Sequence, residues 1–129
     1  MKNNFLVNFI LLHGYSLDNS SLMFGKMGYS LILFEYSHYF KDALAEKHAF
    51  ELLQEVLASP MKSNTFNEGK MGIAWSLIYL TNNQYIEAEY QDLYGQEHEQ
   101  VLVFIKQMEE NETTNITSYI DATSFLMIS

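Results

Sequence analysis

A duplicated tetrapeptide is the feature that most constrains how this chain can fold. The sequence Gly-Lys-Met-Gly occupies residues 25–28 and recurs at residues 69–72, an offset of 44 residues. Each copy is followed by a run of apolar and small residues, then by a polar break and a more charged segment. A period of this length is typical of one supersecondary unit per repeat. The duplication therefore predicts two copies of one unit, over residues 19–60 and 61–110.

The first segment of each copy has the composition of a buried helix. It is apolar nearly all round, from the glycine pair to about Ser37 in the first copy and Leu80 in the second. Serine and asparagine are favoured N-cap residues, so we expect the cap oxygens from Ser20 or Ser21, and from Asn67.

Glycine at these helix starts requires a compensating reason, because it costs about 1 kcal/mol relative to alanine inside a helix. We expect close approach, with a neighbouring helix contacting backbone where no side chain intervenes. The predicted structural helix-start residues are Gly25, Gly28, Gly69 and Gly72.

The second segment of each copy predicts an amphipathic helix. In the first copy the apolar stripe falls at helical spacing, with Asp42 as the expected N-cap and Pro60 beyond the end: Ala45, Ala49, Leu52, Leu53 and Val56. In the second copy Gly95 predicts that the helix starts after it, and the stripe consists of Val101, Leu102, Phe104, Ile105 and Met108.

The whole chain is predicted to be one all-α domain, residues 1–129, built from αα-hairpin repeats. A leading helix is expected within residues 1–18, from about Asn4 to His13 with Gly14 as its C-cap. Residues 111–129 are either a tail or the start of a third unit.

The residues around each glycine pair resemble the repeated glycine-rich helix starts of lanthionine synthetase C-like proteins. Ser-Leu-Met-Phe-Gly-Lys-Met-Gly at residues 21–28 carries the resemblance in the first copy, and residues 66–75 are closer still. The similarity covers roughly residues 19–107. It implies an α/α toroid, with inner and outer rings of helices, of which this chain is an incomplete, amino-terminal portion: about two hairpins where that family has six or seven.

In that family, two cysteines and a histidine hold a zinc ion. The zinc activates a cysteine thiol that adds to a dehydrated serine or threonine of a ribosomally made precursor peptide, forming a thioether ring. This chain has no cysteine and no arginine. We therefore expect no metal, cofactor or catalytic centre of its own, and a truncated, split or reduced relative. The expected partners are a precursor peptide or a complementary toroid-forming chain.

Two other functions remain open from the residues alone. One is a non-catalytic helical module that binds a peptide. The other is a fragment of a glycosidase-type α/α toroid, which requires paired carboxylates. The candidates for that role, for which a solvated position is the simpler interpretation, are Glu87, Glu89, Glu109, Glu110 and Glu112.

The histidines give no recognisable metal motif. None of the four is followed by another at the fourth position, and His98-Glu99 lacks the second histidine of a zincin because Leu102 occupies its place. Surface or core roles are therefore expected for His13, His38, His48 and His98.

The charge balance limits the kinds of partner. The net charge is −9, and beyond Ala45 there are 13 acidic residues against 4 lysines. Such a surface repels nucleic acid and anionic lipid, whereas a basic peptide is attracted, although solubility alone also accounts for acidic surfaces. The apolar stretch Phe5–Leu12 is too short to span a bilayer. We expect a cytoplasmic chain that self-associates through the apolar flanks of an open ring.

Overall fold

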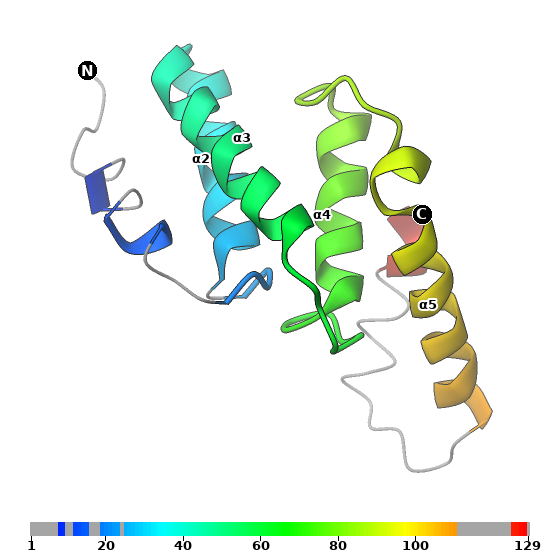
Figure 1. The fold of residues 1–129 in the computed structure, drawn as a ribbon. Helices are drawn as coiled ribbons and strands as arrows, with labels where there is room; N and C mark the ends of the chain where they lie inside the picture. Colours follow the sequence, from blue (N-terminus) through cyan, green and yellow to red (C-terminus); the bar gives the residue numbers. More distant parts are fainter. Residues whose placement is uncertain (1–7, 10–11, 16–18, 24, 111–124, 129) are drawn as a thin grey trace. The chain divides into compact units, whose positions relative to one another are not determined.

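The computed structural model describes residues 8–9, 12–15, 19–23, 25–110 and 125–128, and these residues form helices and connectors without strands (Figure 1). The predicted all-α class is confirmed for this part of the chain. The four long helices are α2 (Lys26–Phe40), α3 (Ala43–Ala58), α4 (Lys70–Asn82) and α5 (Tyr90–Glu110). The chain divides into two compact units, residues 1–60 and 61–129.

The predicted leading helix and carboxyl-terminal segment lie largely outside the described residues. Residues 8–9, 12–14 and 125–128 are helical where they are described. None of the helices in the described parts combines the length and apolarity that crossing a bilayer requires.

The first unit is a helix pair in which α2 packs against α3 (Figure 1). The Phe34 and Phe50 rings meet edge to face, with their centroids 4.9 Å apart. The Ser30 hydroxyl donates a 2.8 Å hydrogen bond across the pair to the carbonyl oxygen of Ala49, so this polar group is satisfied inside the core. The predicted α3 stripe is buried, and so are these residues of α2: Met27, Ser30, Leu33, Phe34, Tyr36 and Ser37.

A tight turn reverses the chain between α2 and α3, so only two residues are needed to join the helices. Lys41 adopts a left-handed conformation (φ 54°), and the next N–H, of Asp42, donates to the carbonyl oxygen of Ser37. The Asp42 carboxylate then accepts hydrogen bonds from the N–H groups of Leu44 and Ala45 at 3.1 and 3.2 Å, which caps α3. The predicted N-cap is therefore confirmed.

The second unit pairs α4 with α5 (Figure 1). Eight of the thirteen α4 residues are buried, which matches its nearly all-round apolar sequence. The α5 span consists of two helical stretches that meet at a kink, and the second stretch starts beside Gly95, within a residue of the start that the sequence predicts. The interruption lies one residue earlier, at Tyr94, whose φ of −146° is not helical. Tyr94, Val101 and Ile105 of α5 are buried, as is Phe125.

Candidate functional site

The two glycine tetrads lie at equivalent helix starts. Gly25 is the N-cap of α2 and Gly69 is the N-cap of α4, both in extended conformation and neither receiving a side-chain cap. The expected cap oxygens of Ser20, Ser21 and Asn67 are therefore not used. Asn67 is exposed, while the Ser21 hydroxyl donates to the carbonyl oxygen of Met23.

Backbone hydrogen bonds replace the missing side-chain caps. The N–H of Lys26 donates to the carbonyl oxygen of Asn19 at 2.8 Å, and the N–H of Lys70 donates to that of Ser63 at 2.9 Å. Each acceptor lies seven residues before its donor. The loop ahead of each helix thus folds back onto the helix start in the same way in both copies.

This folded-back loop is the reason for glycine at positions 25 and 69. A Cβ on Gly25 would lie 2.4 Å from the carbonyl oxygen of Ser21, and a Cβ on Gly69 would lie 2.4 Å from that of Ser63. Gly28 is equally restricted, because a Cβ added there would lie 2.3 Å from the carbonyl oxygen of Leu22. The close contact expected from a neighbouring helix is made at these positions by the preceding loop. Gly72 is buried within α4.

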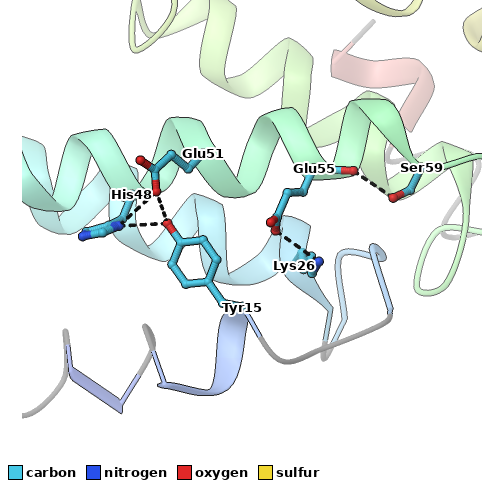
Figure 2. Close-up of polar contacts among 6 residues, drawn as sticks. All are labelled: Tyr15, Lys26, His48, Glu51, Glu55 and Ser59. Carbon is cyan, nitrogen blue, oxygen red and sulfur yellow. Dashed lines mark hydrogen bonds and ion pairs between the residues drawn. The ribbon is translucent and has the colours of Figure 1, made fainter.

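The tetrad lysines connect the two helices of each pair. The Lys26 Nζ atom lies 3.1 Å from the Glu55 Oε2 atom on α3 (Figure 2). The Lys70 Nζ atom donates to the Gln100 Oε1 atom on α5. The tetrad methionine, by contrast, points into the core in both copies, with exposed fractions of 0% and 1%. The motif therefore combines a loop contact, a cross-helix contact and a core residue.

Figure 2 also shows a polar cluster that sequence reasoning missed, formed by Tyr15, His48 and Glu51. The Tyr15 hydroxyl oxygen lies 2.8 Å from the His48 Nδ1 atom and 2.5 Å from the Glu51 Oε2 atom. His48 and Glu51 are one helical turn apart on α3, a spacing that the sequence displays. Tyr15 is 33 residues from His48, so only the tertiary fold brings it there.

The Tyr15, His48 and Glu51 cluster has a structural role. Burial, followed by the hydrogen bond to Glu51, raises the pKa of the Tyr15 phenol above its ordinary value. The same hydrogen bond lowers the pKa of the Glu51 carboxyl below 4.5. A protonated phenol donating to an ionised carboxylate exchanges no proton near neutral pH. The arrangement therefore fastens the residues before α2 to α3.

The remaining histidines are separate from this cluster. His13 and His38 are exposed. His98, on α5, accepts or donates a 2.8 Å hydrogen bond with the Tyr90 hydroxyl and contacts the Phe125 ring at a centroid distance of 5.3 Å. Tyr90 and His98 line a cavity of about 210 Å³, and burial raises the pKa of Tyr90 above its ordinary value.

The donor set does not fit the zinc centre that the resemblance implies. That centre takes two thiolates, and the chain has no cysteine. Across the described residues, no three histidine or carboxylate side chains gather in a group that could hold a metal ion. No catalytic step through zinc is therefore derived for this chain.

The carboxylates considered for glycoside hydrolysis are placed only in part. Glu87 and Glu89 are exposed in the connector between α4 and α5. Glu109 and Glu110 lie in the last turn of α5, with side chains outside the described set, and Glu112 lies beyond the described residues.

Two cavities in the second unit share a lining residue. The first, of about 240 Å³, is lined by Thr65, Phe66, Asn67, Glu68, Met71, Phe104 and Met108. The second, of about 280 Å³, is lined by Asn64, Glu99, Gln100, Val103, Phe104 and Gln107. Phe104 belongs to both, and we refer to them together as the Phe104 cavities.

Comparisons with known proteins add no relative. No protein-family model, curated protein or solved structure matches the chain.

Proposed function

We propose that this chain is a non-catalytic portion of an α/α toroid similar to lanthionine synthetase C-like proteins, which acts on a ribosomally made peptide together with a second polypeptide that completes the ring. The observation that carries the proposal is the shared construction of the two helix starts. The bonds from Lys26 to Asn19 and from Lys70 to Ser63 are 44 residues apart at both ends, the same offset as the tetrapeptide.

The buried positions of the first helices follow the same offset. Each apolar core residue of α2 has a buried counterpart on α4: Met27 and Met71, Leu33 and Leu77, Phe34 and Ile78, Tyr36 and Leu80. A unit that is duplicated in backbone contacts and in core positions is the kind of element from which ring and solenoid proteins are assembled. This supports the toroid interpretation over an unrelated helical bundle.

An incomplete ring leaves apolar side chains without neighbours. Ile32 on α2 is 46% exposed, and it lines a cavity with Leu22, Gly25, Gly28 and Tyr29. On the same helix Tyr39 is 79% exposed. Exposed apolar surface of this kind recruits a partner when it is contiguous. In the proposal, a further helix pair of the ring covers the α2 face that contains Ile32.

The absence of cysteine determines which role the proposal gives to this chain and which to its partner. Ring-forming chemistry of the family's type needs a metal-activated thiol, and this chain has no cysteine to bind that metal. The proposed partner supplies the catalytic centre, and this chain supplies scaffold and peptide contacts. The Phe104 cavities favour the peptide-binding alternative as the second candidate, because that function needs no partner chain.

Association tests the proposal directly. Light scattering over a concentration series should show that the purified chain self-associates, with Ile32→Ser shifting it towards monomer. Gln54→Ser, at an exposed polar position of α3, is the matched control and should leave the distribution unchanged. A chain that is monomeric at every concentration and melts cooperatively would contradict the open-ring proposal.

A further inference from the structure

The Phe104 cavities have two main walls within the second unit, and Met71 of α4 also lines the first cavity. One wall is the loop over residues 64–68, which folds back to the start of α4. The other is a single face of α5, made by Val103, Phe104, Gln107 and Met108, at i, i+1, i+4 and i+5. Phe104 lines both cavities, so a bound chain that contacts its ring can reach both of them.

The volumes indicate what fits. Each cavity is smaller than the range of about 300–1,000 Å³ typical of pockets for whole small-molecule ligands. An apolar cavity of about 150 Å³ already admits a benzene ring. The cavity of about 240 Å³ beside Phe66 and Met71 therefore matches one large apolar side chain. The methionines of the lining, Met71 and Met108, can adapt to differently shaped guests, as peptide-binding surfaces require.

The charged side chains that line the cavities are both carboxylates. Glu68 lines the first cavity and Glu99 the second, and both are exposed. The Oδ1 atom of Asn64, in the wall of the second cavity, is buried and has no hydrogen-bond partner among the described residues. A buried acceptor without a donor costs free energy, which a bound N–H group recovers when the Asn64 side-chain amide turns towards the cavity.

The charge of the second unit reinforces this preference. Residues 61–129 contain ten acidic residues and three lysines, so they account for −7 of the net charge of −9. The tetrad lysine of this unit, Lys70, donates to the neutral amide of Gln100, so its positive charge remains beside the second cavity, where the carboxylates of Glu68 and Glu99 outnumber it. A cationic ligand is therefore complementary to this surface and an anionic ligand is not.

We infer that the Phe104 cavities bind a cationic peptide segment in which a large apolar side chain adjoins a lysine or arginine. The apolar side chain enters the cavity beside Phe66 and Met71. The neighbouring cation pairs with Glu99 and donates to the Asn64 Oδ1 atom, while Glu68 attracts a second cation at the rim. This inference rests on the proposed function, to which it adds the place and chemistry of peptide binding.

The test uses fluorescence anisotropy of the full chain with a labelled, end-capped eight-residue peptide that alternates lysine with leucine and phenylalanine. Exposed ion pairs contribute little each, so Glu68→Gln/Glu99→Gln should weaken affinity about five- to tenfold at low salt. The matched control is Glu87→Gln/Glu89→Gln, which removes the same charge from exposed positions in the α4–α5 connector. The control should change affinity less than twofold.

Two further measurements test the apolar side chain and the cation of the peptide separately. A peptide with serine in place of leucine and phenylalanine should lose most of its binding, because the apolar cavity then stays empty. Asn64→Asp should strengthen binding of the cationic peptide and leave an otherwise identical glutamate peptide unbound. Equal weakening by both glutamine pairs would overturn the inference, since attraction would then come from net charge alone.

Absence of binding to the wild-type chain would also overturn it. That failure is distinguishable from failure of the proposed function, because the peptide assay uses the second unit's cavities while the light-scattering assay concerns Ile32 on α2. A chain that self-associates and ignores the peptide retains the toroid proposal and loses this one.

Discussion

Gly69→Ala is the substitution that most directly tests how the helix starts are built. The added Cβ would lie 2.4 Å from the carbonyl oxygen of Ser63, 2.5 Å from its carbonyl carbon and 2.7 Å from the N atom of Thr65. All three are backbone atoms, so no side-chain rotation relieves the contact. The loop over residues 63–65 must move away from the start of α4.

The cost can be worked from the contacts that this movement disrupts. Forcing an extra methyl group into a packed site costs about 1–3 kcal/mol. Opening the loop also weakens the hydrogen bond from the Lys70 N–H to the Ser63 carbonyl oxygen, which contributes about 1 kcal/mol. We therefore expect Gly69→Ala to lower the free energy of unfolding by about 2–4 kcal/mol, a large part of the stability of a small protein.

Urea denaturation followed by Trp75 fluorescence measures this effect in the second unit, which contains Gly69. Trp75 is the only tryptophan in the chain, and it lies on α4, stacked on Tyr79 with ring centroids 5.6 Å apart. Gly95→Ala is the matched control, because its Cβ would meet only the movable side-chain oxygen of Gln91, at 3.0 Å. Gly95 follows the kink at Tyr94 and has no positive φ, so the change should be neutral or stabilising by up to about 1 kcal/mol.

The comparison of the two glycine variants tests whether the loop contacts the start of α4. If Gly69→Ala and Gly95→Ala unfold at the same urea concentration with the same slope, the loop does not press on the helix start, and the account of the tetrad fails. Gly25→Ala should behave like Gly69→Ala when unfolding is followed by far-ultraviolet circular dichroism, which reports both units.

Three further predictions concern the first unit. Asp42→Ala should lower the free energy of unfolding by about 1 kcal/mol in urea titrations, whereas Asp42→Asn, which keeps a capping oxygen, should change it little. Tyr36→Phe should raise it by about 1 kcal/mol in the same assay, because the Tyr36 hydroxyl is buried without a hydrogen-bond partner among the described residues. The lowered pKa of the Glu51 carboxyl means that its contribution to stability is present above pH 4.5 and is lost as the pH falls through the folded-state pKa. An NMR titration should show the Glu51 pKa returning towards 4.5 in Tyr15→Phe; an unchanged pKa would show that the phenol is not its hydrogen-bond donor.

The sequence predicted the parts of the fold that depend on local patterns. The class, the α3 stripe and the Asp42 cap follow from apolar spacing and from a side chain that caps its own helix. Gly95 indicates a break at the start of the longer stretch of α5, and the break falls on Tyr94, one residue before that glycine. The sequence does not predict the short helical stretch ahead of the break, which starts at Tyr90.

The candidate site was harder to predict because it depends on contacts across the chain. The tetrapeptide indicates that the two helix starts share an unusual structure. The structure itself is a hydrogen bond to a backbone carbonyl seven residues before the lysine, which no side-chain pattern encodes. The Tyr15 partner of His48 and Glu51 is equally invisible in sequence. The cavities around Phe104 required the loop over residues 64–68 to be placed against α5.

The differences between the two tetrads show which part of the motif the fold depends on. Lys26 pairs with the carboxylate of Glu55, whereas Lys70 bonds to the neutral amide of Gln100. A partly exposed ion pair contributes about 0–1 kcal/mol, so replacing its carboxylate with an amide has little effect on stability. Adding one methyl group to either cap glycine costs several times more by the contact argument above. The lysine contact can therefore vary between copies, but the glycine cannot. Because the glycine contact is worth more free energy than the lysine contact, we expect the two copies to keep the glycine. We expect the residue that the lysine contacts to differ, as it does here.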